Sequence, residues 1–304
     1  NPFDIILDTL IVVVVSYIAN HVFVKIFKAV TNVESVFITA LILVLIIPIK
    51  FPTNAVFFVF ASIFAMGAKY LLTIEKRHVF NPAAIAVVAI SFMSNYSATW
   101  WIGTPIMLPS VLIGGLLLLR KIRREKLVFS FLLIYFFMTA IGTLLRGPSF
   151  MSIITAWRFS IFHSALFFFT FVMLTEPKTS PATKKLQGYY SYLVAFLYVV
   201  PQLRLIGLTP EIVLSIGNVF SYIINPNYRL ELPLKWKKQL SSNTFAFVFN
   251  RDSDFKFIPG QYMEWTLQHK NTDNRGNRRY FSIASSPTEN DIIMIVKFYN
   301  PSSS

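Results

Sequence analysis

N-R-R-Y-F-S-I-A-S-S-P, residues Asn277–Pro287, is the stretch that decides the predicted fold of the C-terminal part of the chain. Within it, Arg279–Ser285 contains no Gly or Pro and is bracketed by turn formers, which predicts a short β-strand between two turns. Strand side chains alternate, so Arg279 and Phe281 project from one face. A guanidinium group beside a flat apolar ring suits a ligand that is both phosphorylated and aromatic, such as a flavin dinucleotide.

This stretch resembles the flavin-binding signature of the ferredoxin-NADP reductase superfamily. In that signature an Arg, any residue, an aromatic residue and Ser or Thr precede a small-residue run that ends in Ser. A second landmark of the superfamily, an aromatic residue followed by Pro-Gly-Gln-aromatic, occurs here as F-I-P-G-Q-Y, Phe257–Tyr262. The two motifs stand in the right order and about one hairpin apart, so together they are more specific than either alone.

The resemblance implies an FAD site in which Arg279 holds the pyrophosphate and Phe281 packs against the flavin ring. Ser282 would hydrogen-bond near the redox-active N5 and is the expected catalytic residue. Because strict alternation places Ser282 on the face opposite Phe281, we expect a twist or bulge to bring its hydroxyl round. The alternative is an ordinary barrel strand with a surface Arg. The expected cofactor-binding residues are Tyr262, Arg279, Phe281, Ser282, Ser285, Ser302 and Ser303, the last two at a helix start that either binds an anion or is a plain N-cap.

The composition predicts a membrane protein. Hydrophobic residues make up 55% of the 304 residues and charged residues 14%, with a mean hydropathy of +0.58. A water-soluble domain of this length could not bury so much apolar surface. Much of the +14 net charge lies in short loops between apolar runs, where topology explains it better than nucleic-acid binding does. The absence of Cys excludes disulfides, thiolate iron-sulfur clusters and a catalytic thiol, and we expect no metal site.

Nine apolar stretches are candidates for membrane crossing, which needs about 20 residues. Short stretches that begin at Pro82 and Pro105 are typical of half helices that line a buried site. We therefore expect a polytopic α-helical membrane domain of nine or ten transmembrane helices over residues 1–225. An antiparallel β-barrel FAD-binding domain, truncated, should follow over residues 226–304. The nine stretches are Ile5–Phe27, Val36–Pro48, Asn54–Ile74, Pro82–Phe92, Pro105–Leu119, Leu127–Leu145, Ala156–Leu174, Tyr189–Val200 and Pro210–Ile224.

Loop charge predicts the orientation. If successive stretches cross the membrane in opposite directions, the loops after the first, third, fifth and seventh lie on one side. These loops carry twelve Lys and Arg residues, against four in the loops of the other side. Five of the twelve crowd the range Arg120–Lys126. Positively charged loops stay in the cytoplasm. We therefore expect a multi-pass protein of the cell (inner) membrane with its C-terminal domain in the cytoplasm, and one more helix before Asn1.

Three stretches of the predicted membrane domain carry a second resemblance: Lys69–Val88, Trp100–Gly115 and Phe171–Pro181, the last containing T-E-P-K-T-S-P. They resemble the membrane subunits B of the sodium-pumping NADH:quinone reductase and D of the Rnf complex. The resemblance implies ten transmembrane helices, and it leaves open whether this last loop contacts a cofactor. Members can carry flavin mononucleotide esterified to the Thr of Ser-Gly-Ala-Thr, a tetrapeptide that is absent here. We therefore expect FAD plus, at most, a second non-covalent flavin, FMN or riboflavin.

The favoured function is a membrane-bound flavin-dependent oxidoreductase that passes electrons from NADH or NADPH through FAD to a second flavin or a quinone. The nicotinamide-binding domain is expected beyond Ser304, and partner subunits are unidentified. One alternative is a haem-containing transmembrane ferric reductase or NADPH oxidase-like protein, for which His21 and His163 could bind one haem. A transporter with a regulatory flavin domain is another. Trp100 and Trp101 are interpreted as an interfacial aromatic anchor.

Overall fold

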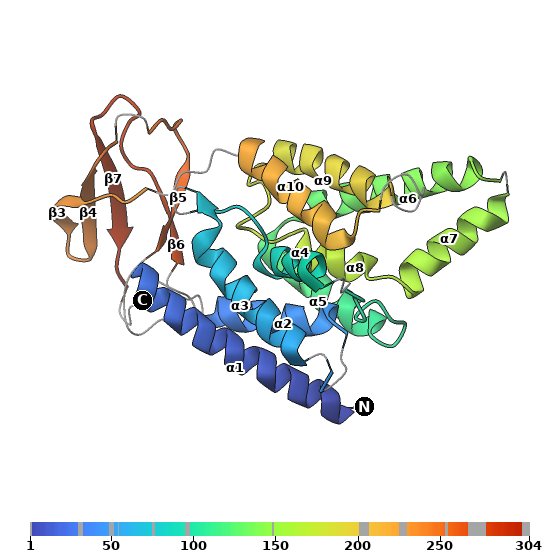
Figure 1. Ribbon diagram of the computed structural model, residues 1–304. Helices are drawn as coiled ribbons and strands as arrows, with labels where there is room; N and C mark the ends of the chain where they lie inside the picture. The colour runs from blue at the N-terminus through green and yellow to red at the C-terminus, as the bar shows by residue number, and fades with distance from the viewer. Residues whose placement is uncertain are drawn as a thin grey trace. The chain divides into compact units, whose positions relative to one another are not determined.

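The computed structural model describes residues 2–29, 33–48, 52–53, 55–74, 77–94, 98–147, 149–200, 207–224, 230–252, 255–266 and 278–299 (Figure 1). The chain divides into two compact units, Asn1–Tyr228 and Arg229–Ser304. We call them the helical unit and the β unit, and each is described by itself.

The helical unit follows the apolar pattern of the sequence closely. Most predicted stretches coincide with one helix to within a few residues, and the ninth, Pro210–Ile224, coincides exactly. Pro82 begins α4, where the Asn81 side chain caps the helix by accepting hydrogen bonds from the N–H groups of Ala83 (3.1 Å) and Ala84 (3.0 Å). Pro105, however, lies in a turn before its helix. The helices are α1 (Pro2–Phe27), α2 (Val33–Ile46), α3 (Ala55–Leu71), α4 (Pro82–Ser94), α5 (Leu108–Ile122), α6 (Glu125–Leu144), α7 (Phe150–Phe162), α8 (Leu166–Phe168), the π-helix η1 (Phe169–Met173), α9 (Lys184–Val199) and α10 (Pro210–Ile224), with a small hairpin of β1 (Thr73–Ile74) and β2 (Arg77–His78).

Two helices of the described chain are long and apolar enough to cross a membrane, α1 over Phe3–Phe27 and α6 over Glu125–Leu144. A third is added if Phe150–Phe162 and Leu166–Met173, which meet at 64°, count as one bent span. Helices α2, α3, α4 and α10 are apolar but shorter. The helical, apolar character of the unit is thus confirmed, whereas nine or ten crossings stay a prediction.

The seventh predicted stretch is broken rather than continuous. Ser164 lies between the two helices and bonds to both. Its hydroxyl donates to the Ser160 carbonyl (2.5 Å), and its oxygen accepts from the Leu166 N–H (3.3 Å). The break also fits closely against Gly103, where a Cβ atom would overlap the backbone of Ser164 and Ala165. Hydropathy alone could not reveal this break, because the residues on both sides of it are apolar.

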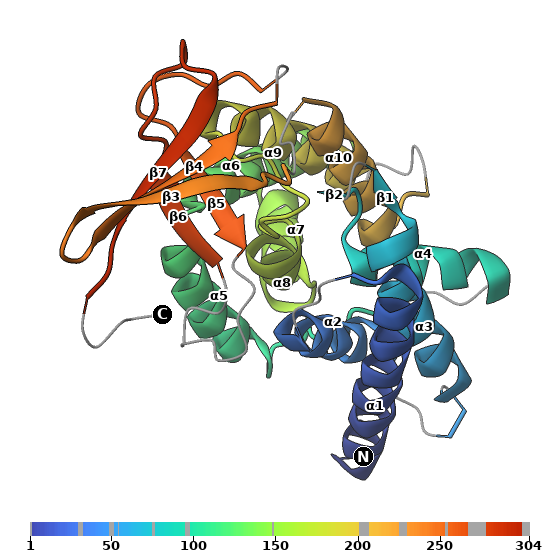
Figure 2. The ribbon, with the colours of Figure 1, turned by 90° about the vertical axis from the view of Figure 1, so that its left-hand side faces the viewer.

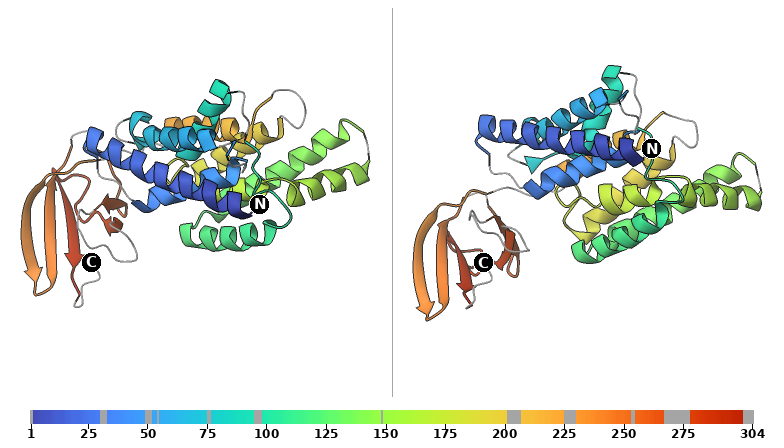
Figure 3. Two further views of the ribbon diagram at one scale, coloured as in Figure 1. Left: turned by 60° about the horizontal axis from the view of Figure 1, so that its bottom comes forward. Right: turned by 90° about the horizontal axis from the view of Figure 1, so that it is seen from below.

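The core of the helical unit is built from neighbouring helix pairs. Helix α1 packs along α3 and α2 (Figure 2), and α9 packs against both α6 and α10. Helices α6 and α7 form an antiparallel pair at one end of the unit (Figure 3). Fully buried Tyr135, Phe131 and Phe169 form an aromatic cluster with Tyr198, with ring centroids 4.7–6.3 Å apart.

The β unit contains two antiparallel sheets, ordered β3-β4-β7 and β5-β6. They share an apolar core, and a backbone hydrogen bond from Ala284 to Ile293 (2.8 Å) joins them. The antiparallel prediction is confirmed. The described strands do not close into the predicted barrel, because closure needs every strand edge to be paired and the two sheets are separate ladders. The strands are β3 (Leu234–Ser241), β4 (Thr244–Asn250), β5 (Tyr262–Thr266), β6 (Arg278–Ser282) and β7 (Asp291–Lys297).

Candidate functional site

The two flavin-type motifs come together in one hairpin of the β unit. Strand β5 follows F-I-P-G-Q and pairs with β6 in the register Tyr262↔Ser282 and Trp265↔Arg279. The turn before β5 requires Gly260, whose φ is +87°. The side-chain oxygen of Gln261 accepts a hydrogen bond from the Ile258 N–H (3.0 Å). The backbone carbonyl of Gln261 accepts another from the Ile283 N–H (3.1 Å). Gln261 therefore links the first motif to the end of the second.

The predicted site residues lie on two faces of this hairpin. Tyr262 and Ser282 are opposite each other on the exposed face, with Tyr280, whose ring packs edge-on against that of Tyr262 at 5.7 Å between centroids. Phe281 lies on the other face, where it packs half-buried against the core of the unit. Arg279, also partly exposed, shares the face of Phe281. The structure thus brings Tyr262 and Ser282 together, and separately Arg279 and Phe281.

The pairing is regular through Ser282, so the strand has no bulge there. Ser282 keeps its hydroxyl on the face opposite Phe281 because an unbroken ladder preserves strict alternation. Strand β6 also ends at Ser282, three residues earlier than predicted. Ser302 and Ser303 lie outside the described residues.

Two residues hold the hairpin in place. Ser285 is buried, and its hydroxyl oxygen accepts a hydrogen bond from the Ile293 N–H (3.1 Å). Sequence reasoning missed Arg251, which donates to the carbonyls of Phe255 (2.9 Å) and Pro287 (2.6 Å) and lies 5.3 Å from the centre of the Phe257 ring. Arg251 therefore joins the segments that flank both motifs. Its sequence signal was weak, since a single Arg after a strand usually faces solvent.

The second candidate is the loop T-E-P-K-T-S-P, Thr175–Pro181, between η1 and α9. The loop folds onto itself: Thr179 donates to the Glu176 carboxylate (3.0 Å), and Ser180 donates to the Glu176 carbonyl (2.5 Å). Buried Arg124, just before α6, donates to the Ser180 hydroxyl (2.6 Å) and the Pro181 carbonyl (2.9 Å). An internally bonded loop clamped by a guanidinium group is a rigid element.

Side chains of further helices converge on the same loop. Asn218 of α10 accepts a hydrogen bond from the Asn81 N–H (2.9 Å) and donates to the Thr179 carbonyl (3.5 Å) and the Tyr190 hydroxyl (3.4 Å). Gln187 of α9 donates to the Pro181 carbonyl (3.1 Å). Asn81, Asn218, Tyr190 and Gln187 are all buried. The loop thus lies at the junction of α4, α9 and α10.

Residues 102–227 match the model of the NQR2, RnfD, RnfE family. This range holds α5 to α10 and the loop Thr175–Pro181. The match covers under half of the chain, and it supports a likeness to the membrane subunits of this family. No curated protein matches the chain. The family match does not reach the β unit, so its flavin assignment rests on the two motifs.

Within the matched residues 102–227, the carboxyl group of Glu176 is the ionisable group of most interest. Burial raises the pKa of this carboxyl, while the hydrogen bond from Thr179 and the charges of Lys178 and Lys69 oppose the rise. Lys69 of α3, outside the matched range, also donates to the Ser35 carbonyl (2.9 Å). A carboxyl group under these opposed influences, at a junction of helices, is a candidate for a functional role.

Two other sequence interpretations concern the helical unit. Trp100 is buried and its indole N–H donates to Glu211 (3.0 Å), which is 1% exposed. The interpretation of Trp100 as an interfacial anchor is therefore wrong: it satisfies a buried acid. Both His residues proposed for haem are exposed, His21 on α1 and His163 at the end of α7. Because α1 packs on α2 and α3 while α7 packs on α6 and α8, the packing gives a shared haem no support.

Proposed function

We propose that the protein is a membrane-bound flavin-dependent oxidoreductase. It takes electrons from reduced nicotinamide through FAD on the β unit and delivers them to a membrane acceptor, either a quinone or a second, non-covalent flavin. The observation that carries this proposal is the hairpin that unites the two flavin-type motifs, in a chain whose membrane region matches an electron-transport family.

The two faces of the hairpin carry groups that suit different parts of an FAD molecule. Arg279 supplies the cation for the pyrophosphate, and its partly exposed side chain is accessible to it. The exposed face offers an aromatic surface in Tyr262 and Tyr280 beside the Ser282 hydroxyl, which can donate a hydrogen bond to a ring nitrogen. Bound FAD supplies two-electron acceptance of hydride and one-electron release.

Contacts between helices support the alternation of crossings on which the cytoplasmic assignment of the β unit rests. If successive stretches cross in alternating directions, certain segments lie on the same side of the membrane, and groups from such segments form hydrogen bonds with each other. On the predicted cytoplasmic side, Tyr70 donates to Asn20 (2.7 Å), Asn81 bonds Asn218 (2.9 Å) and Arg124 bonds Ser180 (2.6 Å). On the opposite side, Trp100 bonds Glu211 (3.0 Å) and Trp101 bonds Val44 (2.6 Å). Nicotinamide donors are available to a flavin only on the cytoplasmic side.

Purification of the full chain in detergent tests the proposal. We expect a yellow protein whose FAD is released into the supernatant on denaturation, because the tetrapeptide that esterifies flavin is absent. Flavin fluorescence that remains on the polypeptide in a denaturing gel would contradict non-covalent binding. A colourless protein that takes up no added FAD would favour the transporter, and a haem absorption band the ferric-reductase alternative.

A further inference from the structure

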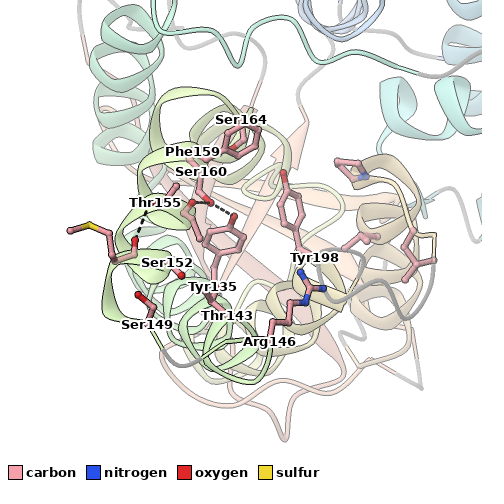
Figure 4. A pocket seen from close by; sticks show the side chains of 15 residues that line it. Tyr135, Thr143, Arg146, Ser149, Ser152, Thr155, Phe159, Ser160, Ser164 and Tyr198 are labelled. Carbon is pink, nitrogen blue, oxygen red and sulfur yellow. Dashed lines mark hydrogen bonds between the residues drawn. The ribbon is translucent and has the colours of Figure 1, made fainter.

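A cavity of about 980 Å³ lies in the helical unit, where the end of α6, helix α7, the end of α9 and the start of α10 meet (Figure 4). Its volume is at the upper end of the range for small-molecule sites. Alternating crossings put the ends of α6 and α9 and the starts of α7 and α10 on the side opposite the Lys- and Arg-rich loops. None of the lining residues belongs to the loop Thr175–Pro181 or to the flavin hairpin.

A single described cation, Arg146, lines the cavity, at the end of α6. Figure 4 shows its guanidinium group extending into the space between α6 and α9. A guanidinium group offers several N–H donors in a fixed plane, which suits a phosphate. This end of the cavity therefore favours an anionic ligand.

The hydroxyl groups of the wall act mainly as acceptors. The Thr143 hydroxyl donates a hydrogen bond to the Thr139 carbonyl (2.7 Å). In the same way the Thr155 hydroxyl donates to the Met151 carbonyl (2.9 Å), and the Ser164 hydroxyl donates to the Ser160 carbonyl (2.5 Å). A hydroxyl that donates to its own helix still has a lone pair for a ligand. The wall thus suits a ligand whose own hydroxyl groups donate hydrogen bonds.

The surroundings of the cavity are apolar. Leu145 and Phe150, on either side of the α6–α7 turn, are 81% and 76% exposed, and Met151, which lines the cavity, is 67% exposed. Exposed side chains of this kind are unfavourable in water and favourable against acyl chains. A ligand that reaches this cavity therefore comes from the bilayer.

We propose that the cavity binds an anionic phospholipid with a hydroxyl-bearing headgroup, of the phosphatidylglycerol type. Its phosphate contacts Arg146, its headgroup hydroxyls donate to Thr143 and Thr155, and its acyl chains lie along Met151 and Phe159. The proposal goes beyond the electron-transfer function and does not depend on it. The lipid would fill the space that separates α7 from α9 and α10.

Native mass spectrometry of the full chain tests this site. The protein is purified, stripped of lipid and titrated with phosphatidylglycerol or with phosphatidylcholine of the same acyl composition. We expect preferential binding of phosphatidylglycerol, and about fivefold weaker binding in Arg146→Ala, because one basic contact is lost. Arg146→Lys keeps the charge and should bind nearly as well as wild type. The control is Arg158→Ala, which removes an exposed Arg of α7 that does not line the cavity.

Two further binding measurements distinguish a phospholipid from the other possible ligands of the cavity. Glycerophosphoglycerol in solution carries the same phosphodiester and headgroup hydroxyls without acyl chains, and it should not displace the lipid. Displacement would show a site for soluble anions and overturn the proposal. Thr155→Val removes a wall hydroxyl with little change of shape, and should weaken phosphatidylglycerol more than phosphatidic acid, which lacks headgroup hydroxyls. Equal lipid binding by wild type and Arg146→Ala, or a quinone recovered in place of phospholipid, would also overturn it.

Discussion

Arg279 carries the charge that the proposed FAD site needs for the pyrophosphate. The Arg279→Ala variant should bind FAD about 10 to 100 times more weakly, since a charge-assisted contact contributes roughly 1.5 to 3 kcal/mol. Equilibrium dialysis of the purified full chain measures this change. Lys256→Ala, at another exposed basic residue of the β unit, is the control and should bind FAD like wild type. Equal FAD affinity in wild type and Arg279→Ala would remove Arg279 from the site.

Arg124 is expected to stabilise the fold of the helical unit by holding the loop Thr175–Pro181. The residue is 9% exposed, and its guanidinium group donates to the Ser180 hydroxyl and the Pro181 carbonyl. Arg124→Ala should lower the unfolding free energy by about 2 kcal/mol, because two buried acceptors lose a charged donor. A thermal unfolding curve in detergent measures the loss. Arg120→Ala, an exposed residue of α5, should leave the midpoint unchanged, and a similar shift in both variants would mean that net charge is responsible.

At the scale of elements, two adjacent glycines of α5 provide a matched test of helix packing. A Cβ atom at Gly115 would overlap the side chain of Phe171 in η1, whereas one at Gly114 would meet nothing within 4 Å. Gly115→Ala should therefore destabilise the helical unit by about 1 to 3 kcal/mol through overpacking. Gly114→Ala should be neutral or stabilising, because Ala favours helix over Gly. Thermal unfolding of the two variants decides; equal midpoints would show that α5 does not pack this closely on η1.

The helices and strands themselves were largely predictable. The ends of α4 and α10 carry local signals, a proline at the first helical position of each, and alternating Phe residues predicted β4. The break at Ser164 was not predictable, because the residues on both sides of it are apolar and its contact with Gly103, some 60 residues earlier in the chain, is a tertiary one. The burial of Trp100 was not predictable either. Its indole N–H needs a buried hydrogen-bond acceptor, and only the packing of the helices brings Glu211 within reach of it.

At the scale of the whole molecule, the testable property is the side of the membrane on which the β unit lies. Reporter fusions after Lys126 and after Asn250 should both report the cytoplasm, because the basic loop and the β unit follow odd-numbered stretches. A fusion after Gly147, in the next loop, is the control and should report the opposite side. If the Lys126 and Asn250 fusions report opposite sides, one predicted stretch does not cross the membrane and the electron path must be redrawn.

The sequence by itself determined the membrane character, the apolar helices and the order of the two flavin-type motifs, because composition, periodicity and short motifs are local properties of a chain. Only the tertiary structure decided which residues meet. It paired Tyr262 with Ser282, clamped the loop Thr175–Pro181 with Arg124, and left the strands of the β unit in two sheets. Contacts between distant segments depend on how the elements pack, and no single stretch of sequence carries that information.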